Sequence, residues 1–395
     1  MKILVITPRF PHPLDKGDKL RAYHQIRLMS KNHEIVVCAL SERPVSQTSL
    51  DALRPWCSRI EVLSFSPGRG RRAGLGAMVL GLPYQVGYFT HSEAAGRFRA
   101  VVDEERPDLV FCQLVRTAEY VKDLSCPCLL DYMDAFSSGM AQRATVGGPW
   151  ARGAHALEHR LLERYERRVF DRFGAHTIIS ERDRAALPFG QKQSIRVVPN
   201  GVDSEVFSPR DSEIRWDLLF VGNMAYPPNV RAAQTLVQDI LPRIRAHRPG
   251  IRVLIAGANP TAAVRRLASD AVEVSGWVDD VVDCYARSRV FVAPMEWGTG
   301  MQNKLLQAMA MELPCVTTPL ASEALGHSAG VMRVGSDPED LAQCVVALLD
   351  QPEVGQSLGR KGREIVVSQF QWESTAQALE GALQQAVVMG RPDDG

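Results

Sequence analysis

Short apolar segments alternate with amphipathic segments along almost the whole chain. Runs that are short and continuously apolar are typical of parallel strands covered by helices on both faces. Before residue 199 the pattern predicts strands at Ile3–Thr7, Ile35–Leu40, Ile60–Phe65, Leu109–Cys112, Cys128–Asp131, His176–Ser180 and Ile195–Val198. Helical patterns lie between them, among them Lys19–Lys31, Glu93–Glu105 and Ala151–Phe173. This alternation predicts right-handed βαβ units in a doubly wound sheet.

The same pattern starts again after a linker, Pro199–Arg215, that is rich in turn residues. Strands are predicted at Leu218–Val221, Val253–Ala256, Val272–Ser275, Val290–Ala293, Cys315–Thr317 and Val331–Val334, and helices at Asn229–His247, Ala262–Ser269, Asn303–Met311 and Pro338–Leu349. We therefore expect an α/β protein with two doubly wound, Rossmann-like domains, residues 1–198 and 199–370, facing a deep cleft. The terminal helix, residues 371–389, is expected to pack back on the first domain. Ligands of such sheets bind at the carboxyl ends of the strands.

Composition narrows the class of protein. The 395 residues carry 46 Lys and Arg against 45 Asp and Glu, so the net charge of +1 argues against a nucleic-acid binder. The eight cysteines form no CxxC pair, and no zinc ribbon is expected. The first apolar run stops at Thr7-Pro8, too short for a signal peptide, and the uncharged stretch Ala73–Ser92 contains several glycines. These features predict a cytoplasmic protein without a membrane-spanning helix.

The strongest candidate site is the segment Pro294–Ala310. A predicted strand ends there, a loop with Gly298 and Gly300 follows, and a helix begins near Asn303. This arrangement presents backbone N–H groups and the positive end of a helix dipole to an anion. Lys304 adds a cation in the first turn, where the dipole disfavours one, so a ligand anion or an ordinary loop with a solvated lysine both explain it.

The second half of this segment resembles the donor-sugar motif of family 4, the retaining glycosyltransferases of GT-B fold. The resemblance rests on Gln307-Ala-Met-Ala-Met-Glu-Leu-Pro-Cys-Val316. Two glutamates of the motif, which hold the sugar hydroxyls and the ribose diol in the family, fall here on Thr299 and Gln307. Gln307 keeps hydrogen-bonding capacity for a ribose. Thr299 does not reproduce the charge, and Glu296 is a candidate substitute.

Within the family, the chain is most similar to the sugar transferases associated with PEP-CTERM and exosortase exopolysaccharide systems. The similarity rests on the helix start Gly300-Met301-Gln302-Asn303-Lys304 and on the opening Lys16-Gly-Asp-Lys-Leu-Arg21 with Tyr23-His24, Arg27 and His33-Glu34. It implies a role in exopolysaccharide biosynthesis.

Three further stretches resemble the family in order and spacing. Val198-Pro-Asn-Gly-Val-Asp203 resembles the interdomain linker, Phe220-Val-Gly-Asn-Met224 the first loop of the donor domain, and Val274-Ser-Gly-Trp-Val-Asp-Asp280 the loop that reads the nucleobase. Many relatives carry a phosphate-binding arginine where this chain has Asn223. The phosphate charge is therefore expected to fall to Lys304 and to the N–H groups of the loop before it.

In the first domain, the segment Lys16–Lys19 lies between the first strand and the first helix, where the family's loop faces the diphosphate and the acceptor. Asp18 or Arg21 is expected to touch ligand, or Asp18 caps the helix. At later strand ends the candidates are Gln113 or Arg116, and Asp131 or Asp134, with Asp134 favoured as the catalytic-region carboxylate or as a cap.

Two other segments carry weaker signals. The basic stretch Pro67–Arg72 and the apolar Leu75–Leu82 after it are interpreted as a solvated loop, with contact to an anionic inner-membrane surface as the alternative. His155-Ala-Leu-Glu-His159 matches the inverted zinc-protease pattern, but its charged surroundings favour a solvated helix over a metal site.

These observations predict a retaining glycosyltransferase that moves a sugar from a nucleotide-diphosphate sugar to a saccharide, lipid-linked or small-molecule acceptor. No metal and no cofactor besides the donor are expected. The alternatives are a non-catalytic nucleotide-sugar-binding relative and a nucleotide-sugar epimerase of the same fold. The residues assigned to donor binding are Gly17, Asp18, Gly222, Asn223, Trp277, Val278, Glu296, Thr299, Gly300, Met301, Gln302, Asn303 and Gln307, and the catalytic candidates are Asp134, Arg116 and Lys304.

Overall fold

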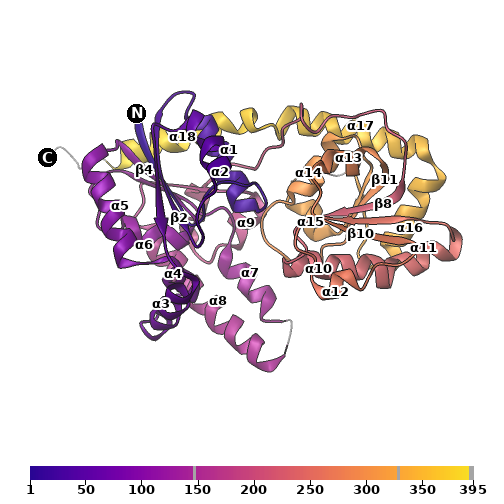
Figure 1. The fold of residues 1–395 in the computed structure, drawn as a ribbon, viewed down its shortest axis with the longest axis horizontal. Coiled ribbons are helices and arrows are strands. Elements are labelled where there is room, and N and C mark those ends of the chain that lie inside the picture. Colours follow the sequence, from indigo (N-terminus) through magenta and orange to yellow (C-terminus); the bar gives the residue numbers. More distant parts are fainter. Residues whose placement is uncertain (146–147, 327–329, 391–395) are drawn as a thin grey trace. The chain divides into compact units, whose positions relative to one another are not determined.

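The computed structural model describes residues 1–145, 148–326 and 330–390 (Figure 1). The chain divides into two compact units. The first comprises Met1–Pro199 together with Ala376–Gly395, and the second is Asn200–Thr375. Each is an α/β unit around one parallel sheet.

The first domain is built on a parallel sheet of order β3-β2-β1-β4-β5-β6-β7. Its strands are β1 (Lys2–Thr7), β2 (Glu34–Ser41), β3 (Arg59–Ser64), β4 (Leu109–Gln113), β5 (Cys128–Asp131), β6 (Ala175–Ile178) and β7 (Arg196–Val197). Successive residues of β1 enter different cores: Leu4 and Ile6 pack on one face, Ile3 and Val5 on the other. Burial on both faces explains why the central strands β1, β4 and β5 are almost continuously apolar.

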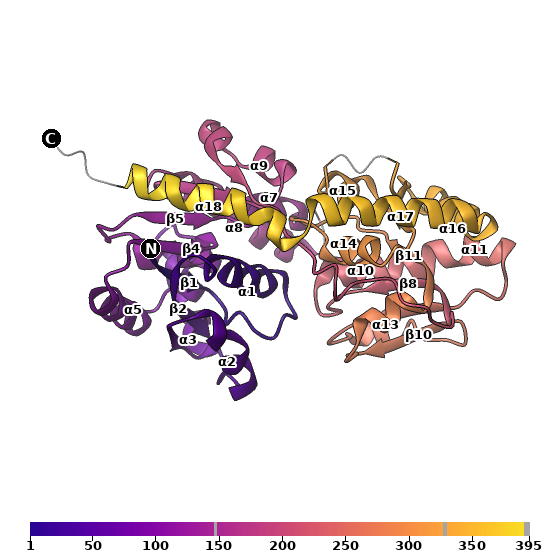
Figure 2. The same ribbon diagram turned by 90° about the horizontal axis from the view of Figure 1, so that it is seen from above.

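Helices cover both faces of this sheet. They are α1 (Gly17–Met29), α2 (Gln47–Leu53), α3 (Pro67–Val79), α4 (Tyr84–Phe89), α5 (Ser92–Glu105), α6 (Ala118–Val121), α7 (Phe136–Arg143), α8 (Pro149–Phe170) and α9 (Glu181–Ala186). The C-terminal helix α18 (Trp372–Met389) adds Leu379, Ala382, Leu383 and Ala386 to the core that contains Ile3 and Val5. Figure 2 shows it running along the sheet of this domain.

The interpretation of residues 67–82 as a solvated loop is wrong, because these residues form helix α3 and its turn into α4. Small residues let the two helices pack closely: a Cβ on Gly74 would lie 2.7 Å from the Tyr84 ring, and one on Gly87 would lie 2.2 Å from the Ala77 Cβ. Of the glycines that weaken the helical pattern in the sequence, Gly70, Gly74 and Gly87 are the ones that this helical hairpin needs.

The second domain has a parallel sheet of order β10-β9-β8-β11-β12-β13. Its strands are β8 (Trp216–Val221), β9 (Val253–Ala256), β10 (Val272–Gly276), β11 (Ser288–Ala293), β12 (Cys315–Thr317) and β13 (Arg333–Val334). Its helices are α10 (Pro227–Gln234), α11 (Leu241–His247), α12 (Ala262–Arg265), α13 (Val281–Ala286), α14 (Asn303–Ala310), α15 (Pro319–Glu323), α16 (Pro338–Asp350) and α17 (Pro352–Gln369). A π-helical turn, Thr235–Ile240, joins α10 to α11. The two domains therefore form an α/β architecture of two Rossmann-like units, as the strand pattern predicted.

Candidate functional site

In each sheet, the strand order reverses beside the first strand of the domain. In the second domain this switch lies between β8 and β11, and the Gly222 loop and the Pro294–Gln302 loop follow those two strands. Open α/β sheets bind ligands outside the carboxyl ends of the strands at such a switch. The site predicted around Lys304 therefore lies where the fold itself favours a ligand.

Lys304 lies in the first turn of α14 among neutral groups. Its Nζ donates to Asn229 Oδ1 at 2.5 Å, lies 3.8 Å from Met295 Sδ and is 4.9 Å from the centre of the Phe220 ring. Burial lowers the pKa of Lys304 to about 7. None of these three neighbours is negatively charged. Lys304 is half-buried, and its ammonium lies against these neutral groups, so the interpretation of Lys304 as a fully solvated surface lysine is wrong. A cation with this environment is poised to bind an anion.

The N-terminus of α14 is formed by the glycine loop. Gly298 and Gly300 have φ angles of 137° and 73°, which side chains other than glycine's rarely adopt. Gln302 is the N-cap residue, and within the described chain no side chain caps this helix end. Asn200 Nδ2 donates to Asn303 Oδ1 at 2.9 Å and fixes the first helical residue. The loop thus holds uncapped helical N–H groups beside the Lys304 ammonium.

The side chains assigned to the sugar and ribose have partners of their own. Glu296 accepts from Thr235 Oγ1 at 2.5 Å and forms an ion pair with Arg231, whose Nε lies 2.9 Å from Glu296 Oε2. Gln307 Oε1 accepts from Tyr285 Oη at 3.1 Å, which leaves the amide NH2 of Gln307 as its donor. The ion pair gives Glu296 a structural partner instead of freeing it to replace the motif glutamate that falls on Thr299.

Asn229 joins two parts of the site that are far apart in the sequence. Its Nδ2 donates to the Asn223 carbonyl at 3.0 Å, while its Oδ1 accepts from Lys304. A Cβ on Gly222 would lie 2.7 Å from Asn229 Nδ2, so a larger residue there would displace the Asn229 amide. Trp277 is 61% exposed at the end of β10, with its Nε1 bound to Asp279 Oδ1 at 3.0 Å. Asn229 is the site residue that the motif comparison missed.

In the first domain, Arg9 follows β1 and Arg116 follows β4, and Asp18 stands in the first turn of α1. Arg9 lies close to both of the other side chains. Asp18 is buried and forms an ion pair with Arg9. Burial opposes the charged form of Asp18, but Arg9 and Arg116 outweigh it and lower its pKa. The N-cap of α1 is Lys16, so the expectation that Asp18 caps the helix is wrong. The Asp18 carbonyl accepts from Gln113 Nε2 at 2.8 Å, which ties the two strand ends together.

Arg21 and Asp131 form a fully buried ion pair, and the expectation that Arg21 touches ligand is wrong. Arg21 Nε and Nη2 donate to the two Asp131 oxygens at 2.7 and 2.9 Å, and both side chains are inaccessible to solvent. Thr177 Oγ1 donates to Asp131 Oδ1 at 2.8 Å. Asp134 lies three residues further on and is half-buried, so it is the Asp of this segment that remains a catalytic candidate.

The segment of α8 that matches the zinc-protease pattern, His155–His159, has a structural role. The Glu158 carboxylate accepts from the backbone N–H groups of Tyr84 and Gln85 at 2.8 and 3.1 Å and so caps α4. His159 Nδ1 contacts the Ser137 carbonyl at 2.9 Å. Throughout the described residues, no cluster of three or more His, Cys, Asp or Glu side chains is arranged to hold a metal ion.

A second carboxylate of α8 caps α7. Glu166 is fully buried, and its Oε1 accepts from the Ser137 N–H at 3.1 Å. Burial raises the pKa of Glu166 to about 7, and the charge of Asp134 adds to the rise. Helix α8 thus fixes the first turns of both α4 and α7.

Comparison with known proteins supports the same division of the chain. Residues 22–201 match the family model described as "Glycosyl transferase 4-like domain", and residues 215–351 match the model described as "Glycosyl transferases group 1". Together the two matches cover most of the chain.

Curated relatives are distant. The chain is 28% identical over 240 residues to the GDP-mannose-dependent alpha-(1-6)-phosphatidylinositol monomannoside mannosyltransferase of Mycobacterium tuberculosis, across 54% of this chain and 62% of that protein. It thus spans less than two thirds of that relative's length. It is 21% identical to an uncharacterized 44.6 kDa protein in the cps region of Klebsiella pneumoniae, across 86% and 88% of the two chains.

Solved structures match over nearly the full length. Sucrose-phosphate synthase from Thermosynechococcus elongatus gives a TM-score of 0.75 at 16% identity, across 98% of this chain and 99% of that one. Alr3699/HepE from Anabaena, solved in complex with UDP and glucose, gives a TM-score of 0.71 at 13% identity. The match covers 97% of this chain and 99% of that one. At these identities the likeness concerns the fold.

Proposed function

Both domains of this chain match glycosyltransferase domain families and together they have the GT-B fold, and from this premise we propose that it moves a sugar from a nucleotide-diphosphate sugar to an acceptor hydroxyl. The second domain would bind the donor and the first domain the acceptor. The alternatives are a nucleotide-sugar-binding relative without activity and an epimerase that needs no acceptor.

The observation that carries the proposal is the environment of Lys304. Lys304 is half-buried, its ammonium lies against neutral groups, and it stands in the first turn of a helix whose N-terminus has no side-chain cap within the described residues. A diphosphate bound there would receive helical N–H groups, the helix dipole and one cation at the same time. Gln307 on the same helix supplies an amide donor that fits a ribose hydroxyl.

We propose a retaining reaction without a metal ion. Lys304 and the N–H groups at the start of α14 would stabilise the negative charge that develops on the departing diphosphate, which is where preorganised donors contribute most. The acceptor hydroxyl would attack from the face that the diphosphate leaves. Arg116 and Asp134 are the charged groups that the first domain offers near the ends of β4 and β5. The similarity to the PEP-CTERM-associated transferases supports a product in exopolysaccharide biosynthesis.

The test is a screen of nucleotide sugars against the full chain. GDP-mannose and UDP-glucose are the first donors to try, since the mycobacterial relative is described as GDP-mannose-dependent and Alr3699/HepE was solved in complex with UDP and glucose. We expect one nucleotide to raise Tm by several degrees and its sugar to be hydrolysed slowly without an acceptor. Binding without hydrolysis or transfer would favour the non-catalytic relative, and conversion of one donor into another would favour the epimerase.

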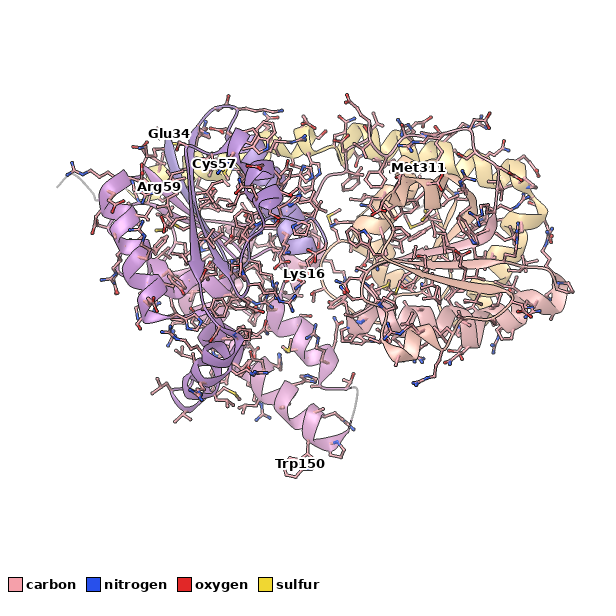
Figure 3. The ribbon with its side chains drawn as sticks, viewed as in Figure 1. Lys16, Glu34, Cys57, Arg59, Trp150 and Met311 are labelled. Atoms are coloured by element: carbon pink, nitrogen blue, oxygen red, sulfur yellow. The ribbon has the colours of Figure 1, made fainter. Side chains whose placement is uncertain are left out.

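Helix α3 supports a second proposal, peripheral contact of the first domain with an anionic membrane. Leu75, Val79 and Leu80 are 61%, 87% and 79% exposed, and Arg71 and Arg72 precede them on the exposed surface of the hairpin. Trp150, 94% exposed, points away from the domain at the start of α8 (Figure 3). Apolar side chains beside arginines favour the interface of an anionic bilayer. No helix among the described residues is long and apolar enough to span a membrane.

Replacing Leu75 and Val79 by aspartate should weaken binding to phosphatidylglycerol-containing vesicles by roughly tenfold or more, because two apolar side chains no longer enter the interface. Vesicle co-sedimentation measures the effect. Val367→Asp/Val388→Asp, at positions on α17 and α18 that are 40% and 72% exposed, introduces the same two charges as a matched control and should bind as the wild type does. Equal binding by the Leu75→Asp/Val79→Asp variant and the wild type would overturn the assignment of α3 as the contact surface.

A further inference from the structure

Two arginines share one aromatic ring at the switch point of the first sheet. Arg9 follows β1 and Arg116 follows β4, and these neighbouring strands flank the point where the strand order reverses. The Cζ atoms of Arg9 and Arg116 lie 5.6 and 5.4 Å from the centre of the Phe89 ring. Two guanidinium groups on one ring repel each other, so the arrangement calls for negative charge nearby.

The carboxylates within reach only partly supply that charge. Asp18 pairs with Arg9, and Lys16, just before α1 (Figure 3), adds a third cation whose pKa is lowered by burial and by Arg9. Burial and Arg9 also lower the pKa of Arg116 to about 10. Outside this group, the charge of Asp134 raises the pKa of Arg116 and the charge of Arg143 lowers it. Asp15 and Lys19, which pair with each other, also act on Lys16 with opposite signs. Within the inner group, three cations against one carboxylate leave an excess of two positive charges.

The groups that contact Arg116 directly are neutral, so Asp18 and Asp134 offset its charge only from a distance and that charge is available to a ligand. Its Nε donates to Gln85 Oε1 at 3.1 Å, and its Cζ lies 4.5 Å from the centre of the Phe136 ring. Gln85 stands in the first turn of α4, which Glu158 caps, and Phe136 begins α7, which Glu166 caps. Glu158 and Glu166, the two capping carboxylates of α8, are therefore positioning residues for Arg116.

We propose that Arg9 and Arg116, with Lys16, bind a phosphate group on the acceptor, close to the hydroxyl that receives the sugar. A phosphate monoester carries about two negative charges at neutral pH, which matches the excess of the cluster. Planar guanidinium groups recognise phosphate oxygens bidentately. The identification of the ligand as an acceptor rests on the proposed function, since the donor's diphosphate is assigned to Lys304 in the second domain. The phosphate ester belongs either to a small molecule or to a lipid.

Calorimetric titration of the full chain with glycerol 3-phosphate and with glycerol tests the site without any donor. We expect binding of glycerol 3-phosphate only, and a loss of about 10- to 100-fold in affinity in Arg116→Gln, the loss typical of one charge-assisted hydrogen bond. Arg116→Lys, which keeps the charge, should retain part of the affinity. Arg99→Gln, on the exposed face of α5, is the matched control. Vesicles that contain phosphatidic acid, a lipid phosphate monoester, would indicate a lipid source if they compete with glycerol 3-phosphate, and a soluble source if they do not.

Two results would overturn the proposal. One is glycerol 3-phosphate binding that is absent or unchanged in a folded Arg116→Gln variant. The other is an equal loss of UDP or GDP affinity in Arg116→Gln, which would assign the cluster to the donor. Donor hydrolysis, measured separately on the same variants, reports on the proposed function, so the failure of one hypothesis is distinguishable from the failure of the other.

Discussion

Lys304→Met should lower kcat for sugar transfer by about 10²- to 10³-fold and raise Tm at the same time. The loss of rate is the size expected when one preorganised donor to a developing negative charge is removed. The gain in stability follows because the Lys304 ammonium is desolvated among Asn229, Met295 and Phe220 without an opposite charge in that set. A lysine that only supported the fold would show the reverse pattern, with stability falling and kcat unchanged.

The gain in Tm should depend on pH. In the unfolded chain Lys304 holds its proton up to its ordinary pKa of 10.5, whereas in the folded chain it releases the proton above about 7. The destabilisation by Lys304 is therefore complete below pH 7 and disappears as the pH rises from 7 to 10.5. The difference in Tm between Lys304→Met and the wild type should be largest below pH 7.

Nucleotide binding gives an independent readout of the same lysine. A bound diphosphate favours the charged ammonium and raises its pKa, so binding at pH 8 should take up close to one proton. Calorimetry in buffers of different ionisation enthalpy measures this uptake, and it should vanish in Lys304→Met. Lys361→Met, at an exposed position of α17, is the control and should change neither kcat nor proton uptake. Full activity of Lys304→Met would contradict the assignment of the diphosphate.

The strands could be predicted almost completely from the sequence, whereas the hairpin of α3 and α4 could not. Each predicted strand is present within two residues at either end. Burial on both faces forces a continuous apolar run in central strands such as β1, β4 and β11, whereas both residues of the edge strand β13 are exposed. In α3, Gly70 and Gly74 lower helix propensity, and the tight contact with α4 that compensates for them is a tertiary contact. A local pattern does not contain that information.

The site was predicted where it depends on local chain geometry. The strand, the glycine loop and the start of α14 are consecutive, so Lys304 could be placed from spacing alone. Its partner Asn229 lies on another helix, and the ring shared by Arg9 and Arg116 belongs to Phe89 on α4. These contacts depend on packing between elements, so no local pattern in the sequence indicates a role for Asn229 or Arg9.

The largest loss of stability in the first domain is expected from Arg21→Met. Asp131 would remain fully buried without its cation, and breaking a buried ion pair in this way costs about 3–5 kcal/mol. The loss should reach the candidate site as well, because Asp131 Oδ1 also accepts from the Met133 N–H at 3.3 Å, where the backbone has a φ of 62° just before Asp134. Urea denaturation followed by circular dichroism measures the free energy of unfolding.

The double variant Arg21→Met/Asp131→Leu separates the burial of charge from the packing of the two side chains. It removes both charges, so it should recover most of the stability that Arg21→Met loses, since an apolar pair of similar volume often replaces a buried ion pair without cost. Arg99→Met breaks an ion pair with Asp123 in which both side chains are 55% exposed, and should cost no more than about 1 kcal/mol. If Arg21→Met lowers the free energy of unfolding as little as Arg99→Met does, the Arg21–Asp131 pair does not determine the turn that carries Asp134. The geometry of that strand end must then come from the hydrogen bond of Thr177 to Asp131 and from the capping of α7 by Glu166.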